Sequence, residues 1–275
     1  MHQGGGLFIL DMLAYPSINP VIFNVYGPIS LNWYGLSYAV GVFLCSYLSS
    51  KSLQNYFNIK IKYDEIASYG IIGIIIGGRL FYVLFYDLEH YIQNPNEIVA
   101  IWLGGMSFHG GLFGLFASMV ALSKKFKINL TKICDVLVIY GPIGLLFGRI
   151  ANFINGELFG RVDDCRFCMI FPNDPLQLPR HPSQIYEALA EGLLLFLVMI
   201  IVNKRFRSYK KPLFNTGLFL ILYSSFRIVI ENFRQPDEQI GLFFEFITMG
   251  QLLCFVQLLL GLFLITKSHR ISNEN

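Results

Sequence analysis

Charged residues are scarce in this sequence. Asp, Glu, Lys and Arg make up 14% of its 275 residues, whereas 54% are hydrophobic. Soluble domains carry about 25% charged residues, so an ordinary soluble protein is excluded. The apolar stretches also lack period-two alternation, which excludes a transmembrane barrel and leaves helices as the only way to span a bilayer. We therefore predict an all-α membrane protein with a single polytopic domain over residues 1–275, since each span and loop takes roughly 35 residues.

Cysteine and N-terminal basic residues are also sparse. Five cysteines are too few for a disulfide scaffold, and Cys45, Cys134 and Cys254 lie in apolar runs. Cys165 and Cys168 form a C-x-x-C motif, which is a weak zinc signal without a second pair nearby. In an oxidising compartment they would be free to form a local disulfide, and we expect no catalytic role for them. Met1 to Leu13 contain no Lys or Arg, so they lack the basic region of a signal peptide and we expect a loose extension.

Seven apolar stretches are long enough to cross a membrane as helices. Most of the 21 Lys and Arg residues lie in the loops after the first, third and fifth stretches and in the C-terminal tail. By the positive-inside rule, these parts are cytoplasmic and the N-terminus lies outside. The connection at residues 155–182 is the one long outer loop, and its aromatic content indicates a small packed cap. The predicted spans are residues 29–49, 65–85, 98–122, 133–153, 183–202, 216–233 and 247–266.

Polar residues inside these spans gather at one depth. With the predicted topology, six spans each place one polar side chain in the outer half of the bilayer. Polar groups at that depth are costly unless they have a partner. A shared polar cavity near the outer leaflet is the simplest explanation. The residues concerned are Tyr34, Arg79, His109, Arg149, Glu187 and Arg227.

Helical spacing aligns several of these polar residues. Tyr223, Arg227, Glu231 and Arg234 recur along one face of the sixth span. One interpretation is a structural ion-pair ladder. However, three intramembrane arginines with one partner glutamate leave surplus positive charge, and guanidinium groups bind phosphate through paired hydrogen bonds. We therefore expect an anionic ligand that carries a phosphate.

Two further motifs have both a structural and a functional interpretation. A lone histidine on an apolar helix, such as His109, is usually structural. Here the flanking glycines of residues 104–111 permit close backbone approach beside a cavity, and histidine is a natural general base near neutral pH. In residues 181–187, Ser183 is positioned to cap a helix, so this segment either contributes to a site or only fixes the entry angle of that helix.

Together these motifs resemble those of the bacterial prolipoprotein diacylglyceryl transferases, from Tyr15 to Lys267. The resemblance implies transfer of a diacylglyceryl group from phosphatidylglycerol to the thiol of the lipobox cysteine of a prolipoprotein. A thioether forms and glycerol phosphate is released, as the first step of lipoprotein maturation. Cys165 and Cys168 lie outside the family pattern. The motifs are at residues 33–36, 77–79, 104–111, 148–163, 178–184 and 226–237.

The resemblance also implies where the site residues lie. The departing phosphate would gain negative charge, which arginines aimed at it would stabilise. Sulfur must attack as thiolate, and His109, Tyr34, an ordered water or the field of the arginines remain alternatives for removing the proton. The predicted catalytic residues are Arg149, Arg227, His109 and Tyr34. The predicted substrate-binding residues are Asn152, Gly160, Tyr223, Glu231 and Arg234, with Arg79 and Glu157 added as polar residues at or near the same depth.

The resemblance implies no cofactor and no metal, and we expect no nucleic-acid partner. The bacterial inner membrane is the expected location, with the active site towards the outer leaflet. An anion or lipid transporter that uses the same arginines is the main alternative. It would need polar residues that continue into the inner half of the bilayer, where Asp135 and Glu191 are the candidates. A lipid-binding protein without catalysis would not need His109 and Tyr34 beside the arginines.

Overall fold

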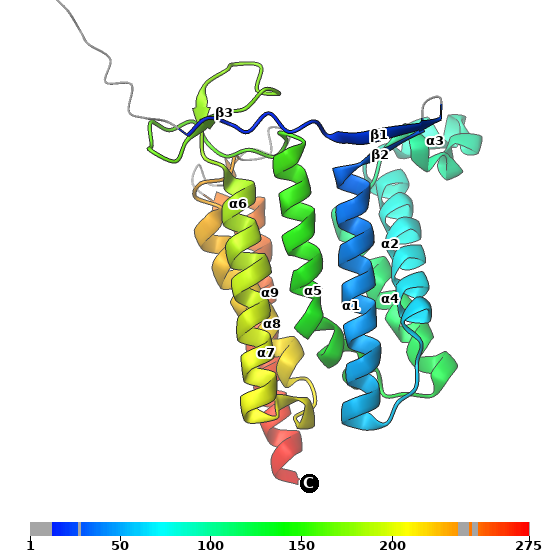
Figure 1. Ribbon diagram of the computed structural model, residues 1–275. Helices are drawn as coiled ribbons and strands as arrows, with labels where there is room; N and C mark the ends of the chain where they lie inside the picture. Colours follow the sequence, from blue (N-terminus) through cyan, green and yellow to red (C-terminus); the bar gives the residue numbers. More distant parts are fainter. Residues whose placement is uncertain (1–12, 27–28, 236–241, 244–246, 275) are drawn as a thin grey trace, which may run out of the picture.

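The computed structural model describes residues 13–26, 29–235, 242–243 and 247–274. Long helices run side by side in a bundle, with a cap at one end and the C-terminus at the other (Figure 1). Within these residues, four helices are long and apolar enough to cross a membrane, and a shorter apolar helix lies beside them at Phe214–Ile230. The four are Tyr63–Phe85, Leu130–Ile154, Ser183–Phe206 and Gly250–Ser272. These helices fit the prediction of a membrane protein. The predicted extension, Met1 to Leu13, lies outside the described residues except for its last one.

Each of the seven predicted spans overlaps helical segments of the bundle, and the third and fifth spans overlap more than one segment each. The helices are α1 (Trp33–Phe57), α2 (Tyr63–Phe85), α3 (Leu88–Gln93), α4 (Phe108–Phe126), α5 (Leu130–Ile154), α6 (Ser183–Glu187), α7 (Leu195–Phe206), α8 (Phe214–Ile230) and α9 (Met249–Glu274). A π-helical segment, η3 (Ala188–Leu194), joins α6 to α7, and short 3-10 turns form η1 (Pro95–Val99), η2 (Ile101–Leu103) and η4 (Ser208–Lys210).

Short antiparallel hairpins accompany the helices, so the prediction of a purely α-helical protein was incomplete. Strand pairs of this length carry too weak a pattern to be recognised in an apolar sequence. Three pairs are present among the described residues: β1 (Val21–Tyr26) with β2 (Ile29–Asn32), β3 (Met169–Ile170) with β4 (Pro179–Arg180), and β5 (Leu242–Phe243) with β6 (Ile247–Thr248).

The predicted start of the third span was wrong. It was placed at Ile98, but α4 begins at Phe108. Gly104 and Gly105 have φ angles of 87° and 75°, which a continuing helix does not permit. Ser107 then caps α4, because its side chain accepts a hydrogen bond from the amide of Gly110. The segment before α4 is therefore a loop with short 3-10 turns rather than part of the helix.

Helix α5 is the centre of the bundle. It packs against α1 on one side and against α6, η3, α7 and α8 on the other, as Figure 1 shows. Small residues allow the close approach: a Cβ on Gly41 of α1 would lie 3.1 Å from the Cα of Gly144, and one on Gly192 of η3 only 2.7 Å from the Cα of Leu146. This packing fixes α5 against the helices that carry the other charged residues.

The end of the bundle opposite the cap has an apolar core and one buried acidic group. Leu53, Leu122 and Ile133 have no exposed surface there. Asp135 is also buried, and its carboxylate accepts hydrogen bonds from the amides of Leu213 and Thr216 at 2.6 and 2.8 Å. Because these amides stand at the start of α8, Asp135 caps that helix.

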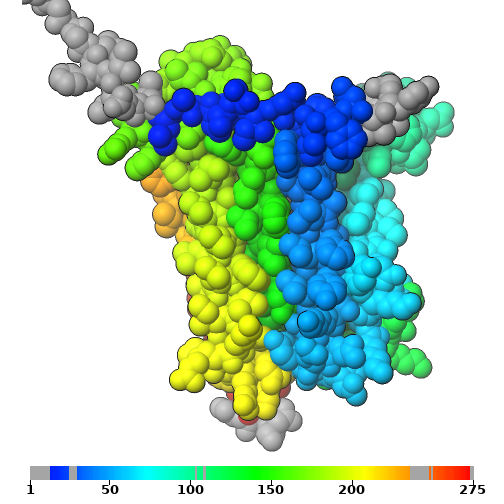
Figure 2. All heavy atoms as spheres, viewed as in Figure 1, coloured from blue at the N-terminus to red at the C-terminus, as the bar shows by residue number. Residues whose placement is uncertain are grey.

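The cap, residues 155–182, is packed against the end of α5. Phe171 has no exposed surface, and its ring contacts the rings of Tyr15, Phe153 and Phe159. Figure 2 shows residues 13–26, the blue segment that includes β1, lying across this end of the bundle.

Candidate functional site

Glu187 is the meeting point of three arginines. It is the last residue of α6, and its side chain has no exposed surface. Its carboxylate lies 2.6 Å from Nε of Arg149 on α5, 2.9 Å from Nη1 of Arg227 on α8 and 3.1 Å from Nη1 of Arg234, which follows α8. One buried carboxylate therefore holds guanidinium groups from separate parts of the chain together.

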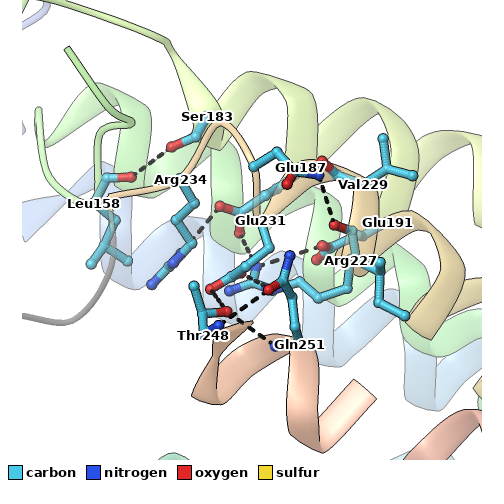
Figure 3. A network of polar contacts seen from close by, with 12 residues as sticks. Leu158, Ser183, Glu187, Glu191, Arg227, Val229, Glu231, Arg234, Thr248 and Gln251 are labelled. Atoms are coloured by element: carbon cyan, nitrogen blue, oxygen red, sulfur yellow. Dashed lines mark hydrogen bonds and ion pairs between the residues drawn. The ribbon is translucent and has the colours of Figure 1, made fainter. Parts of the chain in front are cut away.

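Two more carboxylates complete the charge cluster, by which we mean Arg149, Arg227 and Arg234 with Glu187, Glu191 and Glu231. Glu191 is fully buried in η3, and its Oε1 lies 3.5 Å from Nη1 of Arg227. Neither of its oxygens has a hydrogen-bond partner among the described residues. Figure 3 shows Glu187, Glu191 and Glu231 gathered around Arg227. A π-helical turn such as η3 is rare and is often found at functional sites.

Glu231 is held between α8 and α9. Its Oε2 lies 3.1 Å from Nε of Arg227, one helical turn before it, although this oxygen is not aligned for a hydrogen bond. Its Oε1 accepts a hydrogen bond from Oγ1 of Thr248 at 3.1 Å. A Cβ on Gly250 would lie 2.7 Å from the same oxygen, so the glycine leaves room for the carboxylate.

The surplus of positive charge expected from the sequence is absent from this cluster. The expectation counted Arg79, Arg149 and Arg227 and did not count Glu187 and Glu191 as partners. With Glu231, these two residues place three carboxylates beside the three guanidinium groups of the cluster. The arginine side chains nevertheless keep more exposed surface than the carboxylates, for example 18% for Arg149 against none for Glu187. A guanidinium has five N–H donors, and within the described part of the chain Arg149 and Arg234 form ion pairs with Glu187 alone, so most of their donors are available there for a ligand.

Asn152 and Glu157 form a second polar group next to the charge cluster. Nδ2 of Asn152 donates to Oε1 of Glu157 at 2.7 Å, and Nε2 of Gln184 donates to the backbone carbonyl of Glu157 at 2.6 Å. These bonds tie the end of α5 to the start of α6. The hydroxyl of Tyr34 lies 3.3 Å from that of Tyr38 and within the electrostatic range of Glu157 and Arg149.

Tyr223 and Gly160 belong to the same region for different reasons. The side chain of Tyr223 on α8 is close enough to Glu191, Arg227 and Arg149 to interact with their charges. Gly160 of the cap pairs with Arg234, and its amide donates to the carbonyl of His181 at 2.8 Å. A Cβ on Gly160 would lie 2.8 Å from that carbonyl oxygen, so this close approach requires glycine.

Arg79 stands apart from the charge cluster. It donates to backbone carbonyls between Glu97 and Gly105 and lies 5.1 Å from the ring centre of Tyr91. Among the described residues, no carboxylate forms an ion pair with it. These bonds fix the loop that leads into α4. His109 lies in the first turn of α4, but its side chain is outside the part of the structure that is described.

The cap contains its own ion pairs. Arg180 forms two hydrogen bonds to Asp174, Nε to Oδ2 at 2.7 Å and Nη2 to Oδ1 at 3.0 Å, and they hold the pKa of Asp174 below its usual range. His181 lies 2.9 Å from Oδ2 of Asp163, and this hydrogen bond lowers the pKa of Asp163. Cys165 and Cys168 are joined in a disulfide.

Apolar helices with a cluster of buried charges beneath a packed cap define an integral membrane protein with a polar site inside its bundle. The sequence matches the family model for prolipoprotein diacylglyceryl transferase over residues 20–267. The chain therefore belongs to the prolipoprotein diacylglyceryl transferase family, as its motifs predicted, and it is a transferase.

Curated relatives match along nearly the whole chain. Over 259 residues, the sequence is 46% identical to the phosphatidylglycerol–prolipoprotein diacylglyceryl transferase of Rickettsia felis, covering 94% of this chain and 99% of the relative. The enzymes of the same name from Rickettsia bellii and Rickettsia typhi are each 47% identical over 93% of this chain, with 97% and 98% of the relatives covered.

Sequence reasoning missed the central role of Glu187 and Glu191. Glu187 was recognised as a polar residue at the right depth, but not as a site residue, and Glu191 was assigned to the inner half of the bilayer. Their spacing of four residues in an apolar run was the available signal, because it places both carboxylates on one helix face. Their partners on α5 and α8 depend on tertiary packing.

Proposed function

We propose that this protein transfers the diacylglyceryl group of phosphatidylglycerol to the thiol of the lipobox cysteine of a prolipoprotein. The sulfur forms a thioether with the glycerol carbon, the bond from that carbon to the phosphate oxygen breaks, and glycerol phosphate leaves. Family membership supports this reaction over anion or lipid transport. The observation that carries the assignment to this site is the convergence of Arg149, Arg227 and Arg234 on Glu187.

The arginines are suited to bind the phosphate of the lipid. Arg149 and Arg234 contact opposite oxygens of Glu187 and come from different elements, so the carboxylate spaces their guanidinium groups. In this proposal their remaining N–H donors bind phosphate oxygens, and Arg227 supplies positive charge from the interior side. Negative charge grows on the phosphate as the carbon–oxygen bond breaks, and fixed cations in a site with little water stabilise that charge.

The balance of charge in the cluster suits a reversible phosphate site. An arginine that is buried without a partner would be costly, and Glu187 removes that cost when no lipid is bound. When a phosphate enters, it competes with Glu187 for Arg149 and Arg234, while Glu191 and Glu231 keep Arg227 in place. The cluster would then hold its geometry with and without the lipid.

In this proposal, a group on α1 or α4 removes the proton of the thiol. Tyr34 lies near Arg149 and Glu157, and His109 lies at the start of α4, where Arg79 and Ser107 fix the backbone. Histidine has a pKa suited to this task near neutral pH, so His109 is our first candidate for the base. Tyr34, an ordered water and the field of the arginines remain the alternatives.

The proposed membrane topology has seven spans, with the N-terminus outside and the C-terminus in the cytoplasm. The loops rich in Lys and Arg leave the bundle at the end opposite the cap (Figure 1), as the positive-inside rule requires of cytoplasmic loops. The charge cluster lies near the cap end, which would be the outer leaflet of the bacterial inner membrane. There it would meet both phosphatidylglycerol and a membrane-anchored precursor.

Transport is less consistent with the residues in the inner half of the bundle. A transport path would need polar groups that are free to meet a solute there. Asp135 is engaged in capping α8, and Glu191 belongs to the charge cluster. Neither of the two acidic residues on which the transport alternative relies is therefore free to meet a solute.

The proposal is tested with purified protein in detergent and a synthetic lipobox peptide. Mass spectrometry should detect the diacylglyceryl peptide when phosphatidylglycerol is supplied. A peptide with serine in place of its cysteine is the matched control and should remain unmodified. If neutral diacylglycerol supported the same rate as phosphatidylglycerol, the assignment of the arginines to a phosphate would be refuted.

A further inference from the structure

A second group of side chains with ligand chemistry lies in the cap, separate from the charge cluster. Cys165, Cys168 and His181 each place one ligand atom so that all lie within 4.8 Å of one another. The two cysteines are joined in a disulfide, and Sγ of Cys165 lies 3.5 Å from Nδ1 of His181. We propose that this group is a redox-gated zinc site, closed by the disulfide and opened to Zn²⁺ when the cysteines are reduced.

The spacing of these atoms fits tetrahedral zinc. With zinc–sulfur and zinc–nitrogen bonds of about 2.3 and 2.0–2.1 Å, a sulfur and a nitrogen ligand are about 3.5 Å apart, and two sulfurs about 3.8 Å apart. Sγ of Cys165 and Nδ1 of His181 already have the first separation. The Cα atoms of the cysteines are 5.1 Å apart in a tight turn, in which the amide of Cys168 donates to the carbonyl of Cys165. Rotation of the two side chains after reduction would therefore be enough to complete the site.

A carboxylate orients the histidine for ligation. Nε2 of His181 lies 2.9 Å from Oδ2 of Asp163. This bond favours the tautomer with its proton on Nε2, which leaves the lone pair of Nδ1 facing the sulfurs. Metal-binding histidines usually donate the proton of the other ring nitrogen to a carboxylate, a backbone carbonyl or a water. The hydroxyl of Tyr186 also lies on the Nδ1 side, at 3.2 Å.

The surroundings protect the site and leave a fourth position open. Cys168 has no exposed surface, and His181 is buried with 8% exposed. Beside them is an open cavity of about 390 Å³ lined by Cys165, Phe167, His181, Tyr186 and Phe233. It has room for a water or for the hydroxyl of Tyr186 as the fourth ligand. The sequence motif alone was a weak zinc signal because a second pair of ligands was missing, and folding supplies His181 in its place.

Opening of the site requires a reductant for the disulfide and then Zn²⁺, and no oxidant. A phosphine, which becomes a phosphine oxide with the oxygen of water, or a dithiol, which becomes a disulfide, delivers two electrons. The Cys165–Cys168 disulfide bond breaks, takes up two protons, and two thiols form. Zn²⁺ then displaces the two thiol protons and binds two thiolates and the neutral imidazole. The site also contacts the segment after α8 that carries Arg234, because the ring of His181 lies 5.1 Å from that of Phe233. The metal-bound state is therefore positioned next to the charge cluster without sharing its residues.

The test uses the full-length protein in detergent, reduced with a phosphine and desalted without oxygen. Titration with Co²⁺ should give a thiolate-to-metal absorption band and the strong visible bands of tetrahedral cobalt, which one equivalent of Zn²⁺ removes. The oxidised protein should give neither band. Asp163→Asn should weaken Zn²⁺ binding by about 10- to 100-fold, the usual effect of losing such a partner.

Variants separate this site from other thiols. Cys168→Ser should abolish the thiolate band, whereas Cys134→Ser on α5 should leave it unchanged, because Cys134 is a free cysteine outside the cap. The Cys165→Ser/Cys168→Ser double variant should retain transfer activity, which shows that it is folded. The proposal is overturned if the reduced protein gives no tetrahedral cobalt spectrum, or if the double variant gives the same spectrum.

Discussion

The carboxylate of Glu187 lies 2.6 Å from Nε of Arg149, and the two residues come from neighbouring helices, α6 and α5. This ion pair joins the two helices that flank the cap in the sequence. Arg227 and Arg234 meet the same carboxylate, so Glu187 sets the spacing of all three guanidinium groups. A proposed phosphate site made of arginines thus depends on an acidic residue at its centre.

Glu187→Gln should reduce transfer more than Glu191→Gln. Glutamine keeps the shape of the side chain but removes the charge that holds Arg149, Arg227 and Arg234, and breaking a buried ion pair typically costs about 3–5 kcal/mol. Glu191 makes a longer contact of 3.5 Å to Arg227 alone. The measurement is the initial rate of peptide modification, with the thermal unfolding midpoint of each variant as the control for folding. Equal losses in two folded variants would contradict the central role of Glu187.

Arg149→Ala and Arg227→Ala should abolish transfer while the protein still inserts and folds. Loss of a group that stabilises transition-state charge commonly lowers a rate by about 100- to 1000-fold. Lysine at either position restores the charge but not the two-pronged donor geometry, so the lysine variants should recover activity only in part. Rates at saturating phosphatidylglycerol distinguish these cases. An alanine variant with normal turnover would show that its arginine is structural.

The positions of the helices could be predicted from the sequence because apolar runs of sufficient length leave few alternatives. The stripe of Tyr223, Arg227, Glu231 and Arg234 followed from helical spacing, and Arg227 and Glu231 do form an ion pair one turn apart. The role of Glu187 did not follow, because its partners are on other elements. The periodicity of a sequence shows which residues lie on the same face of a helix. It does not show which other helix packs against that face.

The start of α4 and the partners of Arg79 show a second limit of prediction from the sequence. Gly104 and Gly105 were visible in the sequence as residues that permit an irregular backbone, yet hydropathy alone extended the span back to Ile98. Arg79 was expected to meet a ligand because a buried cation needs a partner. The structure supplies backbone carbonyls instead, for example those of Glu97 and Gly105 at 2.6 and 3.0 Å. Every residue has a carbonyl, so no side-chain pattern in the sequence identifies this kind of partner.

Arg79→Lys tests whether Arg79 binds substrate or shapes the loop before α4. Lysine keeps the charge but cannot reach several carbonyls at once, so the loop should loosen and the unfolding midpoint should fall. Transfer should also fall through a lower maximal rate, because the start of α4 carries His109. A substrate-binding role predicts a higher KM for phosphatidylglycerol with an unchanged unfolding midpoint. Unfolding curves and substrate titrations on one preparation decide between the two.

Acid should weaken the cap through Asp174. Arg180 lowers the pKa of Asp174 from its ordinary value of 3.8, so the ionised carboxylate favours the folded cap. This contribution is complete above the ordinary value and is lost as the pH falls through the lowered pKa of the folded state. At neutral pH Asp174→Asn should therefore unfold at a lower temperature than the unmodified protein. The two midpoints should approach one another as the pH falls from about 4 towards the lowered pKa of Asp174. Asp164→Asn, an exposed neighbour in the same cap, is the matched control and should keep a constant difference. If the midpoints of Asp174→Asn and the unmodified protein differ equally at neutral and acidic pH, the ion pair does not contribute to the pH dependence of the cap.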